Sequence, residues 1–214
     1  MMPIRTNRVI LHLGFAVATL TGCQSGDKPT PPPATTASPA TAPSTERVVG
    51  PLSPANAQAL STMNDRLGDY IDLHRKLERS LPKLPKDATP QEIDKNQRAF
   101  EALVRKARAT AKPGDIFTPE ARPVIKRLLA AIFGGPEGQQ LKASIMDENS
   151  VGITFSVNDR YPDKVPLSSV PPQVLQTLPK LSEDLEYRFI GNRLILLDTH
   201  AHVIADFIED ALPE

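Results

Sequence analysis

Two histidines and an aspartate near the C-terminus are the only stretch of this chain with the character of a metal site. They stand in the sequence Asp198-Thr199-His200-Ala201-His202. On a strand, alternate side chains point to the same face, so Asp198, His200 and His202 could chelate one ion. Three protein ligands suffice for an open metal site. We expect no cofactor, and the alternative is a divalent transition metal ion bound by these three residues. Without a metal, the two histidines would be an exposed pair near a turn with no ligand role.

Other charged groups allow weaker chemical readings. Asp206, Glu209 and Asp210 could supply an acidic pair for proton transfer, and a solvated strand end explains them equally well. The sequence "VRKARATAK", residues 104–112, places basic side chains on one face of a helix. Such a face is either solvated surface or a contact with anionic lipid or peptidoglycan.

Catalytic and nucleic-acid-binding functions find no support in the sequence. No serine lies in a nucleophile-elbow sequence, and the glycines make no phosphate-binding spacing. The 25 basic and 25 acidic residues balance, which argues against a dedicated nucleic-acid binder. We therefore expect a protein that is not an enzyme and does not bind nucleic acid.

The elements that must position these groups form a helical half, 51–148, and a β-rich half, 151–214. An apolar stripe at spacings of three and four predicts a helix over about 55–81, formed by Leu60, Met63, Leu67, Tyr70, His74, Leu77 and Leu81. His74 lies on this stripe, which suggests a packed side chain. A second helix is predicted from Thr89, with Glu92 completing a capping box, to about Ala111.

Two further helices complete the helical half. A start signal at 118–120 opens the third, which is either kinked at Pro123 or begins later, and Gly134-Gly135-Pro136 ends it. The fourth covers about 137–147.

The β-rich half is predicted from two-residue alternation. Strands are expected over 151–157, at Leu185 to Phe189, over 194–198 and over 203–208, with a hairpin at Gly191-Asn192 and a short helix from 171 to 178. The fold class is α+β, with about four helices packed against a small antiparallel β-meander.

The first fifty residues indicate export. Arg5 and Arg8 precede a twelve-residue apolar run, 9–20, which is too short to cross a bilayer of about 30 Å. The sequence Leu20-Thr21-Gly22-Cys23 follows and resembles a bacterial lipobox, which implies cleavage before Cys23 and its acylation. The alternatives are a conventional signal peptide or an uncleaved anchor. Because Gln24 and Ser25 are not the inner-membrane retention aspartate, the resemblance implies the outer membrane, facing the periplasm.

A tether and one domain follow the signal. We expect a signal peptide over 1–22, a proline-, threonine- and alanine-rich linker over 23–50 and a globular domain over 51–214.

Two resemblances bear on function. The stretch 170–210, with "LEYRFIGNRLILLD", resembles a small periplasmic module of bacterial nickel/cobalt-homeostasis proteins and of some virulence-modulating membrane proteins. The module commonly has glycine in its second turn, where this chain has 199–202. The whole folded part, including "GDIFTPEA", also resembles uncharacterised exported bacterial proteins. The first resemblance implies a metal-linked role in the periplasm.

We therefore expect a lipid-anchored periplasmic protein with a non-enzymatic binding or modulating role. Its partners would be the membrane, through the lipid, and another envelope protein. The alternative function is a metal-binding accessory protein of nickel, cobalt or zinc homeostasis.

Replacement of Cys23 tests the anchor. We expect Cys23→Ser to leave the protein soluble or uncleaved, because the acyl acceptor is lost. Membrane partitioning and intact mass measure this, and an unchanged partitioning and mass would refute the anchor.

Overall fold

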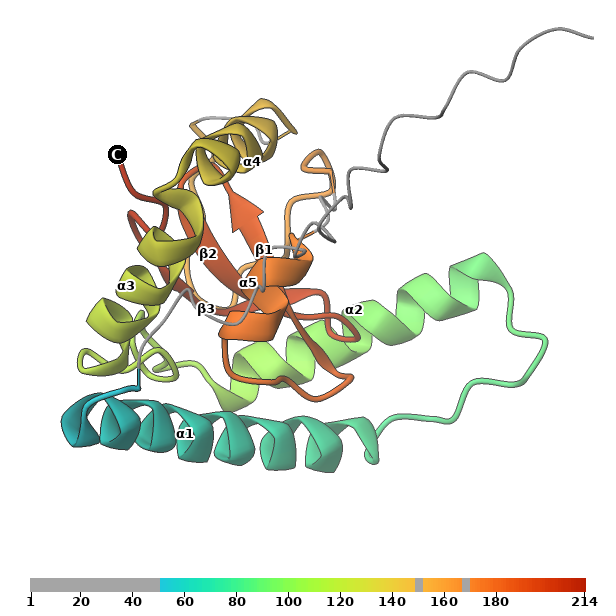
Figure 1. The fold of residues 1–214 in the computed structure, drawn as a ribbon. Helices are drawn as coiled ribbons and strands as arrows, with labels where there is room; N and C mark the ends of the chain where they lie inside the picture. Colours follow the sequence, from blue (N-terminus) through green and yellow to red (C-terminus); the bar gives the residue numbers. More distant parts are fainter. Residues whose placement is uncertain (1–50, 149–151, 167–169) are drawn as a thin grey trace, which may run out of the picture. The chain divides into compact units, whose positions relative to one another are not determined.

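The computed structural model describes residues 51–148, 152–166 and 170–214, and it shows the predicted α+β fold (Figure 1). Helices dominate the first part of the described chain and a three-stranded antiparallel sheet ends it. The helices are α1 (Pro54–Glu78), α2 (Pro90–Ala107), α3 (Ala121–Phe133), α4 (Pro136–Glu148) and α5 (Pro172–Thr177). The strands are β1 (Leu185–Ile190), β2 (Arg193–Asp198) and β3 (Val203–Ile208).

Local signals set where the helices begin. Ser53 accepts a hydrogen bond from the N–H of Asn56 at the start of α1, and Thr89 and Glu92 form the predicted capping box of α2. Helix α3 begins at Ala121, later than the 118–120 signal. Pro123 therefore lies in the first turn, where its missing N–H costs no hydrogen bond. Of the two predicted alternatives, a kink or a later start, the later start is confirmed.

Helices α1 and α2 end earlier than the sequence predicts. Helix α1 ends at Glu78 and not at 81, and α2 ends at Ala107 and not at 111. In α1 the stripe is confirmed, because Met63, Leu67, Tyr70 and His74 are all buried. The connection between α1 and α2 extends away from the sheet (Figure 1).

The sheet has the strand order β1-β2-β3, and its three predicted strands are confirmed. Gly191, with a φ of 59°, makes the two-residue turn between β1 and β2. Residues 194–198 of β2 and all six residues of β3 are buried. These strands are therefore covered on both faces, which explains their continuous apolar runs.

The strand predicted over 151–157 is not formed in the described residues; Val151 lies outside them. Phe155 and Val157 are buried while Thr154 and Ser156 are exposed, so the alternation correctly reports burial. Asn158 then turns the chain with a φ of 69°. Backbone pairing with β3 begins only at this turn. The N–H of Asn158 donates to the carbonyl of Ile204, and the N–H of Ile204 donates to the carbonyl of Asp159. Arg160 and Val203 then form one bridge. Alternation alone does not supply a strand partner.

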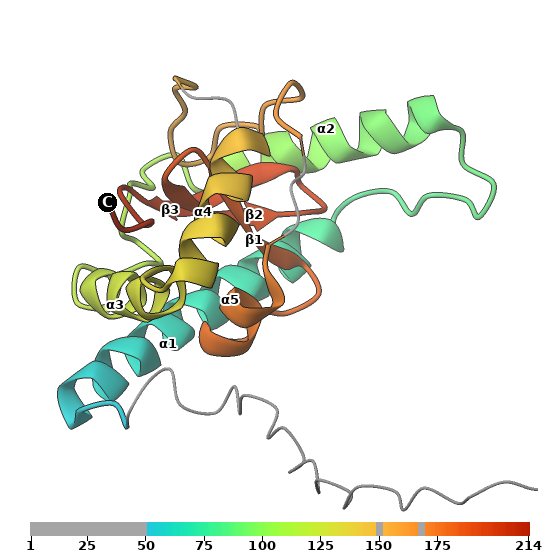
Figure 2. The same ribbon diagram turned by 45° about the horizontal axis from the view of Figure 1, so that its top comes forward.

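Two apolar clusters lie on opposite faces of the sheet. On one face, β-strand side chains such as Tyr187 and Phe189 pack with side chains of α1, α3, α4 and α5. Figure 2 shows these four helices beside the sheet. On the other face, Ile195, Ile204 and Phe207 pack with the irregular segment 153–165. Helices α1, α3, α4 and α5, the sheet and this segment thus form three layers.

A buried carboxylate ties the loop before α3 to the sheet. Asp206 of β3 accepts hydrogen bonds from the backbone N–H groups of Gly114, Ile116 and Phe117 at 2.8–3.2 Å, and from its neighbour Phe207. The β2–β3 register shifts between Leu196 and Leu197, so Ala205, next to Asp206, has no paired residue on β2. Burial raises the pKa of Asp206. The hydrogen bonds from the four N–H groups lower it, but burial is the larger effect.

Within the described residues, no helix combines the length and the apolar character that a membrane span requires.

Asp206 is the loop anchor, since it holds the loop before α3 against the sheet. This role can be tested by removing its charge. We expect Asp206→Asn to lower the free energy of unfolding by about 2 to 4 kcal/mol, because an amide has one acceptor oxygen and brings an NH₂ group against backbone donors. Denaturant unfolding of the full chain measures this. The matched control is Asp163→Asn, since the Asp163 side chain is 72% exposed; a change within about 0.5 kcal/mol is expected there. Equal effects of the two substitutions would contradict the anchor.

Candidate metal centre

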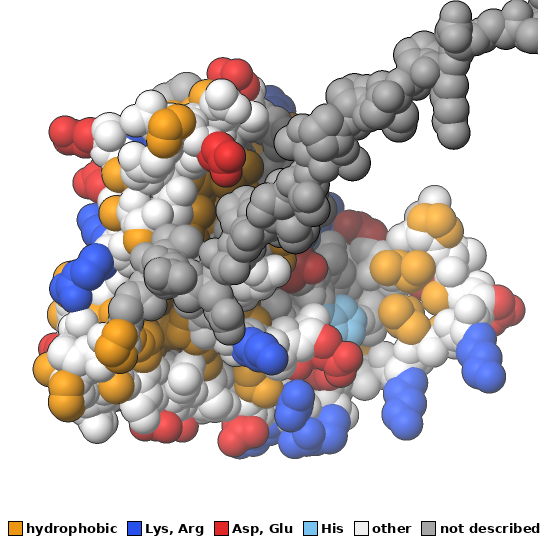
Figure 3. All heavy atoms as spheres, viewed as in Figure 1, with side chains coloured by type: hydrophobic (Ala, Val, Ile, Leu, Met, Phe, Trp, Pro, Cys, Tyr) orange, Lys and Arg blue, Asp and Glu red, His pale blue; other side chains and the backbone are white. Residues whose placement is uncertain are grey.

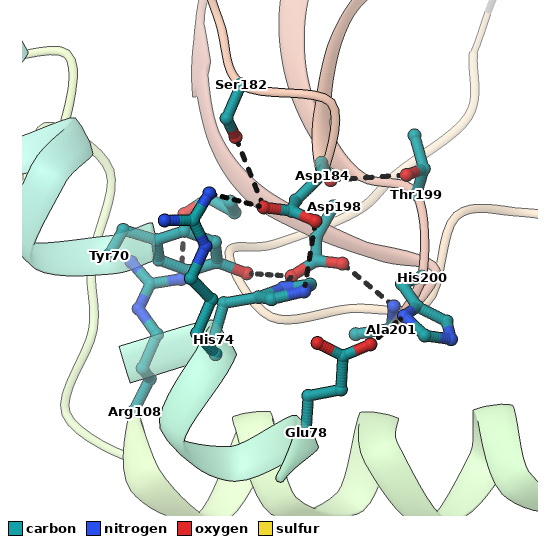
Figure 4. A network of polar contacts seen from close by, with 12 residues as sticks. Tyr70, His74, Glu78, Arg108, Ser182, Asp184, Asp198, Thr199, His200 and Ala201 are labelled. Atoms are coloured by element: carbon teal, nitrogen blue, oxygen red, sulfur yellow. Dashed lines mark hydrogen bonds and ion pairs between the residues drawn. The ribbon is translucent and has the colours of Figure 1, made fainter. Parts of the chain in front are cut away.

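The carboxylate of Asp198 joins α1 to the end of β2. Its Oδ2 accepts hydrogen bonds from the Tyr70 hydroxyl and from Nδ1 of His74, both at 2.7 Å. Its Oδ1 accepts the N–H of Ala201 at 2.8 Å, in the turn after β2. Asp198 is fully buried, so these three donors replace its hydration. Figure 4 shows this Asp198 network, formed by Asp198, Tyr70, His74 and Ala201.

Burial changes the ionisation of Tyr70. Burial raises its pKa well above the ordinary value, and the charge and hydrogen bond of Asp198 act in the same direction. The Arg108 guanidinium, 4.9 Å from the centre of the Tyr70 ring, opposes this shift. Tyr70 is therefore a neutral donor to Asp198.

His74 has one nitrogen held and one left over. Because Asp198 accepts from Nδ1, that nitrogen carries the proton. Nε2 is buried and makes no hydrogen bond within the described residues; its nearest charged neighbour is Asp184, at 3.7 Å. A carboxylate on one imidazole nitrogen and a free second nitrogen is the arrangement of metal-ligating histidines.

Negative charge surrounds this imidazole. Burial lowers the pKa of His74, but the hydrogen bond and charge of Asp198 and the charges of Asp184 and Glu78 outweigh it, so the pKa is raised. The site thus favours a positive charge at His74, which either a proton or a metal ion supplies.

Two further donors complete a group of three. Glu78 lies one helical turn after His74, on the same face of α1. Its Oε1 is 2.9 Å from Nδ1 of His200, in the turn between β2 and β3. One ligand atom from each of His74, Glu78 and His200 lies within 4.8 Å of the others. The side chains of Glu78 and His200 are 39% and 46% exposed, whereas that of His74 is 0% exposed.

An apolar wall supports the two imidazoles. Phe100 of α2 meets both rings edge-on, with centroids 4.8 Å from His74 and 5.4 Å from His200. Phe100 is fully buried and packs with Val104, Ala201 and Val203, against the partly buried Leu77 and Leu81. This wall lowers the local dielectric and strengthens charge interactions at the group.

The ligand set predicted from the sequence is not the set that the structure brings together. Asp198 ends β2 and faces α1, and His200 joins the three-residue group. His202 does not belong to that group. The sequence allows two arrangements, one strand face that carries all three residues or a hairpin tip at which the two imidazoles converge. His200 and His202 lie in the turn between β2 and β3, as in the second arrangement, but only His200 joins the three-residue group. With a φ of 57°, His202 packs edge-on against Tyr161 at 5.8 Å. Burial and the charge of Arg160 lower the pKa of His202. The charges of Asp163 and Glu101 act in the opposite direction and are outweighed.

Sequence reasoning treated His74 only as a packed side chain. It is indeed buried, but its partners are Asp198 and Asp184, 124 and 110 residues away in sequence. The spacing of His74 and Glu78, at i and i+4, was the available signal for a ligand pair on one helix face.

The other predicted groups have structural partners. Asp206 is buried and holds the loop before α3. Glu209 and Asp210 follow the end of β3 and are exposed, where Glu209 pairs with Arg193 at 2.9 Å and Asp210 accepts a hydrogen bond from Asn192. The solvated strand end therefore describes Glu209 and Asp210 but not Asp206. In the basic stretch, Arg105 pairs with Glu101. Arg108 turns inward, where it donates to Asn158 and to the carbonyl of Ala205.

Comparison of the chain with protein-family models, with curated proteins and with solved structures found no match.

A hydroxyl deletion tests the Asp198 network. We expect Tyr70→Phe to cost about 1.5–3 kcal/mol of unfolding free energy, because it removes a hydrogen bond to a buried charge. Tyr187→Phe is the matched control: its hydroxyl donates to the neutral carbonyl of Pro179 at 3.0 Å, and about 0.5–1.5 kcal/mol is expected. Denaturant unfolding measures both. If Tyr70→Phe costs no more than Tyr187→Phe, the charge of Asp198 is not what the hydroxyl stabilises.

Proposed function

We propose that this protein binds a divalent transition metal ion through His74, Glu78 and His200, as a non-enzymatic accessory protein of the cell envelope. One observation carries the proposal. Nε2 of the fully buried His74 makes no hydrogen bond within the described chain, and it belongs to a residue whose ligand atom lies within 4.8 Å of those of Glu78 and His200.

The donor set suits this class of ion. Two imidazoles and one carboxylate match the preferences of zinc, nickel and cobalt, and three protein ligands leave a coordination position open. Bonds of about 2.0–2.1 Å in tetrahedral geometry separate donor atoms by about 3.4 Å, so the donors need to approach by at most about 1.4 Å. Glu78 and His200 are both partly exposed, and they can make this movement while His74 stays fixed.

Charge supports the same conclusion. The carboxylates of Asp198, Asp184 and Glu78 all act on His74. Asp198 holds Nδ1 and so orients the ring, the role of an outer-shell carboxylate. A bound cation would balance a negative site.

A binding role is favoured over a catalytic one because the nearby carboxylates already have partners. Tyr70 and His74 occupy Asp198, and Arg75 lies 3.6 Å from Asp184, which Ser182 also contacts. A general base needs a carboxylate free to accept a proton from substrate.

The proposed location follows from the N-terminal sequence. Acylation at Cys23 would anchor the protein in the outer membrane, facing the periplasm, with 23–50 as a spacer before the domain. These residues lie outside the described part of the chain. A metal site tethered in the periplasm agrees with the role that the nickel/cobalt-homeostasis resemblance implies.

Metal titration tests the proposal. We expect nickel, cobalt or zinc to bind the untagged full-length chain in detergent with one-to-one stoichiometry, and His200→Ala and Glu78→Gln each to weaken binding by at least about tenfold. Isothermal titration calorimetry measures the affinity, and a metal-dependent rise in Tm reports the linked stabilisation.

The matched control is His202→Asn. Asparagine tolerates the positive φ at this position, and His202 is outside the three-residue group. The metal affinity of the variant should therefore stay within about twofold of wild type. Metal binding that is unchanged in His200→Ala and Glu78→Gln, or that is lost in His202→Asn, would contradict the assignment of the three ligands.

A further inference from the structure

A pocket of about 640 Å³ adjoins the candidate metal centre. It lies where the end of α1, the connection to α2 and the turn between β2 and β3 meet. The side chains that matter to its chemistry are Glu78, Arg79, Leu81, Lys83, Leu84 and His200. Its volume falls in the range of small-molecule sites.

Two of the three proposed metal ligands line this pocket. Glu78 and His200 do so, while His74 stays buried behind them. A metal ion held by the three residues would therefore have His74 on its protein side and its open coordination position on the pocket side.

The pocket also carries positive charge. Arg79 and Lys83 line it, and neither is ion-paired within the described part of the chain. Figure 3 shows basic side chains along the α1–α2 connection, and histidine atoms at the surface beside acidic side chains. Glu78 is the single carboxylate in the lining. With a divalent ion bound to Glu78, the pocket would have a clear excess of positive charge.

We infer that this pocket takes a small carboxylate ligand that completes the coordination of the metal. The inference rests on the proposed function. One carboxylate oxygen occupies the open position, and Arg79 and Lys83 bind the remaining anionic group, Arg79 with its planar fork of N–H donors. Leu81 and Leu84 form an apolar wall for the carbon skeleton of the ligand. The protein would then hold its metal as a ternary complex with an organic acid.

Cobalt(II) spectroscopy with malonate tests this inference. The d–d absorption of protein-bound cobalt reports a change of ligand directly. In the full-length chain in detergent, loaded with cobalt, we expect malonate to shift the band saturably, and the uncharged analogue malonamide to leave it unchanged.

Substitutions then identify the pocket. The double variant Arg79→Gln/Lys83→Gln should bind cobalt as tightly as wild type. Its affinity for malonate should fall by at least about tenfold, because charge-assisted hydrogen bonds are lost. Lys86→Gln is the matched control. It removes an exposed lysine of the same connection outside the pocket lining, and it should keep wild-type malonate binding.

The outcomes separate the two proposals. Absence of cobalt binding overturns both. Cobalt binding with no malonate shift, removal of the cobalt by malonate, or equal malonate affinity in the double variant overturns the carboxylate pocket alone. A shift that the double variant loses and Lys86→Gln keeps supports it.

Discussion

The buried carboxylate of Asp198 is the constraint on which the rest of this structure depends. A fully buried charge is costly unless donors surround it. Here the donors come from two different parts of the chain: Tyr70 and His74 from α1, and Ala201 from the turn after β2. Satisfying this one group therefore fixes α1 against the end of the sheet. Asp206 does the same for the loop before α3, through backbone donors.

The same constraint prepares the candidate metal centre. By accepting from Nδ1, Asp198 selects the tautomer of His74 and leaves Nε2, which makes no hydrogen bond within the described residues, as the nitrogen that can bind a metal ion. The turn that supplies Ala201 also carries His200, so the hydrogen bond that closes the turn helps to bring the second imidazole towards α1. Fold and site thus share one set of contacts. Loss of the Tyr70 hydroxyl should weaken both, even though Tyr70 is not a ligand.

Local patterns account for most of the fold. The stripe on α1, the capping box at Thr89 and the turn at Gly191 each depend on a few neighbouring residues, and the elements they predict are present. The failures involve long-range partners. The alternation of apolar and polar side chains after Val151 could not show that the chain would turn at Asn158 and not form a strand. No local rule could place His74 against Asp198, 124 residues away, or give His202 the positive φ that directs it to Tyr161.

The difference in burial among the three proposed ligands bears on what such a site is for. Structural zinc sites hold four fixed ligands and close around the ion. Here one ligand is rigid and fully buried, and two are partly exposed beside a pocket. Glu78 and His200 contact each other at 2.9 Å, so a metal ion bound through these two atoms would replace their contact. In the proposed site, an ion held by one fixed and two movable ligands would exchange through the pocket more readily than an ion enclosed by four fixed ligands.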